Sequence, residues 1–202
     1  MRALRSFVAV VAIAGILVGC GAGSSPQGTF EKMKTAVKGG GGMGGTLKYM
    51  TPESQNAIVG GMGFGVAMGA SLGKKFGKAD ADAEAICKKH GIDLEKLPQI
   101  TGKEDMTQLS IDFGAGIKDK PGFIKDLEEL NKKKGKNSVD LTAKMGEATL
   151  KDVKVTGNTA AGKVVTKSDG KETTQPIYFK QVNGEWLIDI IPTLRKNTKV
   201  GK

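Results

Sequence analysis

The chain has 202 residues, with 31 Lys and Arg against 21 Asp and Glu, a formal net charge of +10, 30 Gly, two Cys and one His. This length fits one domain with a substantial core, and so few Cys and His exclude a zinc finger, an iron–sulfur cluster and a disulfide-rich scaffold; no metal or cofactor is expected. Because the lysines are spread among only seven Phe, two Tyr and one Trp, the positive charge does not predict a nucleic-acid partner.

Residues 1–19 have the features of a signal peptide. Arg2 and Arg5 provide a positive start, and the uncharged run from Phe7 to Val18 is too short to cross a bilayer core, which needs ~20 residues. The run ends at Leu17-Val18-Gly19-Cys20, which resembles the lipobox of bacterial lipoproteins. In that family the peptide is cut before the Cys, whose thiol receives diacylglycerol. The alternatives are an uncleaved membrane anchor and a chance Cys after a secretory segment.

The lipobox resemblance implies cleavage between Gly19 and Cys20, lipidation of Cys20 and a domain held outside the cytoplasm in the cell envelope. Two or more acyl chains anchor firmly, because each buried methylene contributes ~0.8 kcal/mol. Gly21 is not the Asp that resembles an inner-membrane retention signal, so in a bacterium with two membranes we expect the outer membrane, with the domain in the periplasm. The small, turn-rich residues 20–28 predict a flexible tether.

Helices are predicted through the first two thirds of the mature chain. Thr29 is the expected N-cap of a short helix that the glycines 39–42 end. Thr51 and Pro52 mark the start of a second helix, which enters the glycine-rich segment 57–77. Further helices are expected over residues 79–90, over residues 103–118, and from Pro121 until the lysines and glycine at 132–135 end it.

The glycine-rich segment 57–77 has Gly61, Gly65, Gly69 and Gly73 at every fourth position. One interpretation is a glycine zipper, in which small residues on one helix face let another helix approach closely, either within a membrane or in an oligomer. The other is a buried helix or a glycine-interrupted surface segment. Each Gly costs ~1 kcal/mol relative to Ala inside a helix, so a helix here needs a packing partner.

Four strands are predicted after about residue 138, over residues 150–156, 160–167, 176–182 and 185–191. The dipeptides Gly157-Asn158, Asp169-Gly170 and Asn183-Gly184 between them favour tight hairpin turns, because these residues accept positive φ at low cost. Helices followed by an antiparallel meander predict an α+β fold with helices on one face of a curved sheet, ending in a basic tail over residues 193–202.

The C-terminal pattern is similar to the nuclear-transport-factor-2-like superfamily. The resemblance rests on the segments 153–160 and 177–188, and the segment 47–54 is similar to a turn in small lipoproteins of that superfamily. It covers residues 29–192 and implies a cone-shaped sheet wrapped by helices around a pocket. Asp112, Tyr178, Trp186 and Asp189 are the candidate pocket residues, whereas His90 is expected to be solvated or to cap its helix.

The leading hypothesis is a lipid-anchored, non-enzymatic binding module for a small ligand or an envelope protein, with no residue assigned to catalysis. The first alternative is a pocket enzyme of the isomerase or hydratase kind that uses Asp112 or Asp189 as general base. The second is a membrane-associating structural protein that oligomerises through Gly61, Gly65, Gly69 and Gly73.

Overall fold

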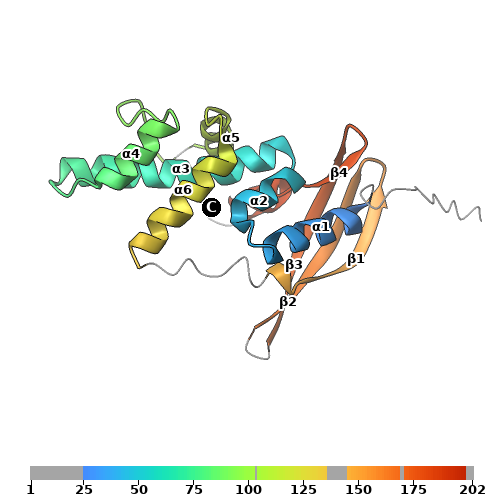
Figure 1. Ribbon diagram of the computed structural model, residues 1–202. Coiled ribbons are helices and arrows are strands. Elements are labelled where there is room, and N and C mark those ends of the chain that lie inside the picture. The colour runs from blue at the N-terminus through green and yellow to red at the C-terminus, as the bar shows by residue number, and fades with distance from the viewer. Residues whose placement is uncertain (1–24, 103, 136–144, 169–170, 199–202) are drawn as a thin grey trace, which may run out of the picture.

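The computed structural model describes residues 25–198 apart from 103, 136–144 and 169–170, and Gly19 and Cys20 therefore lie outside the described residues. The helices come first and an open four-stranded antiparallel sheet follows, so the predicted α+β class is confirmed (Figure 1). The elements in chain order are α1 Pro26–Lys38, α2 Gly42–Thr46, the 3-10 turn η1 Leu47–Tyr49, α3 Pro52–Lys75, α4 Ala81–Lys89, α5 Met106–Ala115, α6 Lys120–Lys133, β1 Thr149–Thr156, β2 Thr159–Ser168, β3 Lys171–Val182, β4 Glu185–Ile188 and α8 Ile191–Thr198.

The first helix starts earlier than its sequence predicts. The Ser25 hydroxyl accepts the N–H of Gly28 at 3.0 Å, and Pro26, which needs no N–H partner, takes the first helical position. Thr29, the expected N-cap, is instead buried within the first turn, where its hydroxyl donates to the carbonyl of Trp186 at 2.5 Å. Residues 26–28, which were assigned to the flexible tether, therefore belong to α1.

The other long helices begin at capping side chains. Thr51 caps α3 as predicted, accepting the N–H of Ser54 at 3.2 Å, with Pro52 at the first position. Carboxylates occupy the same position elsewhere: Asp80 before α4, Asp105 before α5 and Asp119 before α6 each accept a first-turn N–H. These Asp side chains also suit the positive end of the helix dipole.

The sheet is a simple meander in the order β1-β2-β3-β4. Tight turns join β1 to β2 and β3 to β4, where Gly157 and Gly184 have φ values of 59° and 84°. In β1 the register shifts between Lys151 and Lys154, and Asp152 has a φ of 54°, which marks a bulge in this edge strand. Strand β4 stops at Ile188, because residues 191–198 form α8 rather than the end of a strand and a tail.

One face of the sheet is covered, and α1 lies across it (Figure 1). Phe30 and Met33 of α1 pack in the same buried cluster as Phe179 of β3 and Ile188 of β4. The cluster continues into α6 through Phe123, so a single core joins the sheet to the helices.

Helix α3 is the long axis of the helical part. It begins at the edge of the sheet, where the N–H of Thr51 donates to the carbonyl of Ile188 at 2.9 Å, and it runs away from the sheet for 24 residues, about 36 Å at 1.5 Å per residue. Among the helices in the described residues, only α3 is long enough and apolar enough to span a membrane. The mean hydropathy of its most apolar stretch is 1.2, and 39% of that stretch is buried inside the domain. Buried core helices of soluble proteins share both properties, so this is weak evidence of a span.

The glycines of α3 divide between two sides of the helix. Gly60 and Gly63 are buried, and a Cβ on Gly60 would stand only 1.8 Å from the carbonyl oxygen of Ser110 in α5. Gly61, Gly65 and Gly69 are exposed, and Gly65 and Gly69 have nothing within 4 Å of where a Cβ would be. The close helix contact inside the domain therefore uses other glycines than the predicted four-residue repeat.

Candidate functional site

Asp189, a candidate pocket residue, joins the end of β4 to the start of α3. Its Oδ1 accepts the hydroxyl of Ser54 at 3.2 Å and the N–H of Ile191 at 3.1 Å. The Ser54 hydroxyl in turn accepts the N–H of Ile190 at 3.0 Å, and Ser54 has no exposed surface. This carboxylate is engaged in fixing the chain where α8 begins.

The other three candidates lie in different surroundings. Asp112 is on the exposed side of α5, where it accepts the Gln108 amide at 2.9 Å, one helical turn away. Trp186 is 7% exposed and belongs to the core. The Tyr178 hydroxyl accepts from Lys196 of α8 at 2.7 Å, and the Lys196 ammonium also lies 5.2 Å from the ring centre. None of the four lines any of the three grooves described below.

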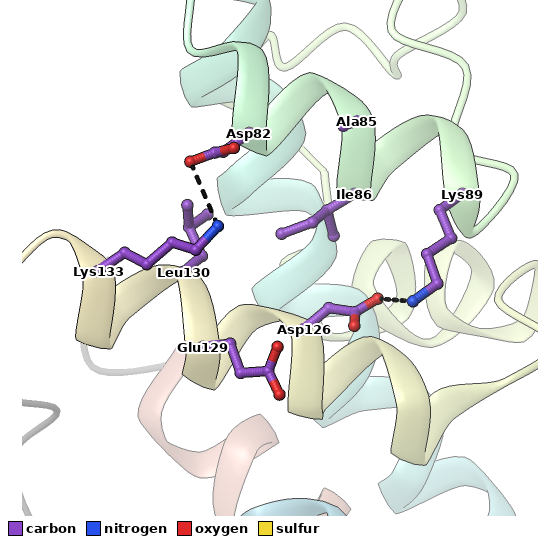
Figure 2. Close-up of a pocket in the computed structure, with 8 residues that line it drawn as sticks. All are labelled: Asp82, Ala85, Ile86, Lys89, Asp126, Glu129, Leu130 and Lys133. Atoms are coloured by element: carbon purple, nitrogen blue, oxygen red, sulfur yellow. Dashed lines mark ion pairs between the residues drawn. The ribbon is translucent and has the colours of Figure 1, made fainter.

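A groove of about 210 Å³ lies between α4 and α6 (Figure 2). Its floor is apolar and its rim is charged with both signs. One ion pair, Lys89 Nζ to Asp126 Oδ2 at 2.7 Å, closes one end, and Lys133 approaches Asp82 to 4.0 Å at the other. The lining residues are Asp82, Ala85, Ile86 and Lys89 from α4 and Asp126, Glu129, Leu130 and Lys133 from α6.

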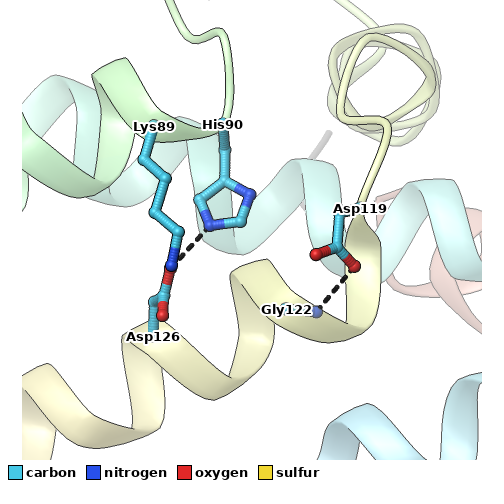
Figure 3. Close-up of polar contacts among 5 residues, drawn as sticks. All are labelled: Lys89, His90, Asp119, Gly122 and Asp126. Atoms are coloured by element: carbon cyan, nitrogen blue, oxygen red, sulfur yellow. Dashed lines mark hydrogen bonds and ion pairs between the residues drawn. The ribbon is translucent and has the colours of Figure 1, made fainter.

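His90 meets Asp126 beside this groove (Figure 3). The ring Nε2 lies 2.7 Å from Asp126 Oδ2, and since a carboxylate only accepts, Nε2 is the donor. The His90 side chain is 4% exposed and its ring packs edge-on against Phe123, with centroids 5.1 Å apart. Lys89 first and His90 second hold the pKa of Asp126 below the usual value of an Asp side chain, and Asp126 raises the pKa of Lys89.

A His–carboxylate pair is able to hold and move a proton, but a reactant must reach the ring to use it. Here the ring is buried, and only Lys89 and Asp126 of the three face the groove. The arrangement therefore ties the C-terminal end of α4 to the middle of α6. Of the two expectations for His90, the solvated side chain was wrong, whereas the residue does occupy the C-cap position of α4. Its partner is 36 positions away, and the one sequence signal is that Asp126 lies next to the apolar face of α6.

Two further grooves are more open. One of about 650 Å³ is lined by α4, the loop that follows it and Lys74 of α3. Glu84 Oε1 is there a buried oxygen without a hydrogen-bond partner among the described residues. The other, about 430 Å³, separates the glycine turn 40–45 from α6, and Glu128 spans it by accepting the N–H of Met43 at 3.0 Å. Within the described ranges no group of three or more His, Cys, Asp or Glu side chains is arranged to hold a metal ion.

Cys87 is the remaining thiol in the described part of the chain. It has no exposed surface, and burial, followed by the nearby Glu84 carboxylate, raises its pKa. A protonated, enclosed thiol is a poor nucleophile, so Cys87 acts as a small core residue.

Comparison of the chain with protein-family models, with curated proteins and with solved structures finds no match. The structure therefore defines only an architectural class. In this α+β architecture, N-terminal helices pack on an open four-stranded antiparallel sheet, and a charged groove lies between α4 and α6.

Proposed function

We propose that this chain is a bacterial lipoprotein, anchored through acyl chains on Cys20, whose α+β domain is a non-enzymatic binding module in the cell envelope. The observation that carries the proposal is the sequence Leu17-Val18-Gly19-Cys20 at the end of a short apolar run. In a bacterium with two membranes, Gly21 favours the outer membrane over retention at the inner one. The partner is a small ligand or an envelope protein.

The use of the carboxylates supports a binding role over a pocket enzyme. A general base needs an approachable oxygen with room for substrate beside it. Asp189 Oδ1 is taken up by Ser54 and by the N–H of Ile191, and Asp112 lies on an exposed helix surface beside Gln108. The hydrogen bonds of both side chains account for these residues without a catalytic role.

We also propose that the sheet belongs to the nuclear-transport-factor-2-like type. What supports this is the meander order of the strands and the Asn183-Gly184 turn that leads directly into Trp186.

Replacement of Cys20 tests the anchor. We expect Cys20→Ala to remove the chain from the membrane fraction of a bacterial host and to abolish incorporation of an alkyne-tagged fatty acid. Cys87→Ala is the matched control, because it removes the other Cys and leaves the anchor site intact. Retention of the fatty-acid label by Cys20→Ala would overturn the lipoprotein proposal.

A glycine-mediated oligomer is the second candidate, favoured by the exposure of Gly61, Gly65 and Gly69 with open space beside the last two. Gly73 is less available, because a Cβ there would lie 2.7 Å from the carbonyl oxygen of Lys78 in the chain's own turn. Gly65→Gln would place a long side chain in the stripe, and it is expected to shift an oligomer toward monomer in analytical ultracentrifugation. A wild-type chain that sediments as a monomer at all concentrations would exclude this candidate.

A further inference from the structure

The C-terminal end of α3 carries the most exposed large apolar side chain in the described part of the molecule. Phe76 is 76% exposed, and Leu72, one helical turn before it, is 45% exposed. Because positions four apart lie on the same side of a helix, the two side chains form one small apolar surface. A single exposed Leu is ordinary, whereas a Phe with three quarters of its surface in water beside it indicates a partner.

Three lysines lie at this end of α3. Lys74, Lys75 and Lys78 are exposed, and none of them takes part in an ion pair within the described residues. Two carboxylates at the start of the following helix are engaged by other lysines: Lys134 pairs with Asp80 and Lys133 approaches Asp82. Lys74 also lines the open groove beside α4, together with Glu84. The end of α3 therefore combines an apolar surface with exposed positive charges.

This end of α3 protrudes at the far side of the molecule from the sheet. Figure 1 shows the turn between α3 and α4 at one extreme and the sheet with the start of α1 at the other. Helix α3, which starts beside β4, is itself about 36 Å long, from its 24 residues at 1.5 Å per residue.

We propose that Leu72, Lys74, Lys75, Phe76 and Lys78, the Phe76 corner, form a docking surface for an anionic lipid bilayer. The aromatic ring and Leu72 enter the headgroup region while the three ammonium groups meet lipid phosphates. This goes beyond the proposed lipid anchor, because it concerns the protein surface itself and is measurable without acylation.

A bilayer fits this surface better than a second copy of the chain does. A second copy would bring its own three lysines against these three, and like charges in contact oppose association. Leu72, Lys75, Phe76 and Lys78 line none of the three grooves described above and lie at a protruding turn (Figure 1), which suits a deformable, negatively charged layer of lipid headgroups.

The position of the lipid anchor is compatible with simultaneous contact. Cys20 lies five positions before Ser25, the cap of α1, and five residues span at most about 17 Å. An acylated Cys20 would hold the sheet end of the domain near the bilayer, and the Phe76 corner reaches the same bilayer when α3 lies along it. When the acyl chains hold the domain at the bilayer, the effective concentration of lipid headgroups at the Phe76 corner rises, so each of the two membrane contacts strengthens the other.

The test uses the unacylated chain of residues 20–202 with Cys20→Ser, which contains every residue of the buried core. It is sedimented with vesicles of phosphatidylcholine alone and with vesicles that also contain phosphatidylglycerol. Binding is expected only to the anionic vesicles and is expected to weaken as salt is raised. Phe76→Ser should lower the partition coefficient about tenfold, and each Lys→Gln change in the corner about fivefold.

Matched controls separate the corner from general charge and from misfolding. Val155→Ser removes a side chain that is 56% exposed on β1, and changing Lys118, Lys154 and Lys180 together to Gln removes the same charge from exposed positions elsewhere. Both are expected to bind like the parent, and circular dichroism checks that each variant is folded.

Three results would overturn the proposal. The first is no binding to either vesicle, and the second is an equal loss of binding for the control lysine variant. The third is a parent chain that binds no vesicles but associates with itself, provided that Phe76→Ser abolishes this self-association. That result would assign the Phe76 corner to contact with a second copy of the chain. Since the vesicle assay needs no acyl chain, failure here leaves the Cys20 result unaffected, and failure of the Cys20 test leaves this one unaffected.

Discussion

Gly60 of α3 and Gly114 of α5 lie against one another where the two helices cross. A Cβ on Gly60 would stand 2.6 Å from the backbone nitrogen of Gly114, and a Cβ on Gly114 would stand 2.8 Å from that of Gly60. A Cβ on Gly114 would also come within 2.0 Å of the carbonyl oxygen of Asn56. All these neighbours are backbone atoms, which are unable to move without separating the helices.

We expect Gly60→Ala and Gly114→Ala each to lower the free energy of unfolding by about 3 kcal/mol or more, because overpacking forces the two helices apart. Urea unfolding followed by circular dichroism measures the change. Gly65→Ala and Gly69→Ala are the matched controls on the same helix, where open space lies beside the backbone. They should raise stability by about 0.5–1 kcal/mol, since Ala restricts the unfolded chain. Equal effects at all four positions would contradict the helix crossing described here.

Ser54→Ala tests the junction of α3 with the end of β4. The Ser54 hydroxyl is buried, donates to Asp189 and accepts from the N–H of Ile190, so its loss leaves buried polar groups without partners. We expect a loss of about 2–3 kcal/mol in thermal or urea unfolding. Ser110→Ala, which removes only a hydroxyl bonded within its own helix, is expected to change stability by less than about 0.5 kcal/mol. A Ser54 effect as small as the Ser110 effect would exclude a stabilising role for the bonds of Ser54 to Asp189 and Ile190.

The pairing of Asp126 with Lys89 and His90 predicts a pH-dependent contribution to stability. The pKa of Asp126 is lower in the folded chain than in the unfolded chain. The stabilisation that the Asp126 carboxylate provides is therefore complete above the usual Asp pKa of about 3.9, and it is lost as the pH falls through the pKa of Asp126 in the folded chain. Asp126→Asn should therefore cost about 1–2 kcal/mol at pH 7. The difference from wild type should shrink toward pH 3.

Urea unfolding at several pH values measures this difference. Asp112→Asn serves as control, because Asp112 is exposed and bonds only one neutral amide on its own helix. At pH 7 its difference from wild type should stay below about 0.5 kcal/mol. A constant Asp126→Asn difference between pH 7 and pH 3 would contradict the ion pairs.

Glu104 closes the turn before α5 and has a distinctive titration. Its carboxylate accepts the hydroxyl of Thr101 at 2.6 Å and the N–H groups of Thr101 and Gly102, and these bonds, the hydroxyl first, lower its pKa to about 2. In a carboxyl-carbon NMR titration, Thr101→Val should raise this pKa toward the usual Glu value, whereas Thr101→Ser should preserve it. An unchanged pKa in Thr101→Val would show that the Thr101 hydroxyl does not lower the pKa of Glu104.

The elements with local signals could be predicted from the sequence. Thr51 followed by Pro52 marks the start of α3 by capping chemistry alone, and the glycine turns at Gly157 and Gly184 fix two hairpins because they need positive φ. The start of α1 was predicted too late, because both Ser25 and Thr29 are able to cap a helix. The burial of Thr29 against Trp186, 157 positions away, has no local signal.

The functional surfaces were harder to predict because they depend on which side of a helix is covered. The four-residue repeat of glycines in α3 indicates a close-packed stripe, yet the domain buries Gly60, Gly63 and Ala67 and leaves Gly61 and Gly65 outside. Both sides have helical spacing, and only the position of α5 distinguishes them. The candidate pocket residues depended on a resemblance that supplied no three-dimensional neighbours, so Asp112 was grouped with side chains of quite different surroundings.

The two edges of the sheet differ in a way that limits how the chain is able to aggregate. The β4 edge is occupied at Ile188 by the start of α3, whereas β1 is an outer strand. The bulge at Asp152 and the flanking Lys151 and Lys154 interrupt the regular row of hydrogen-bonding groups that a strand from another molecule would need. Contact between many copies of this chain therefore disfavours the growth of intermolecular sheets through β1.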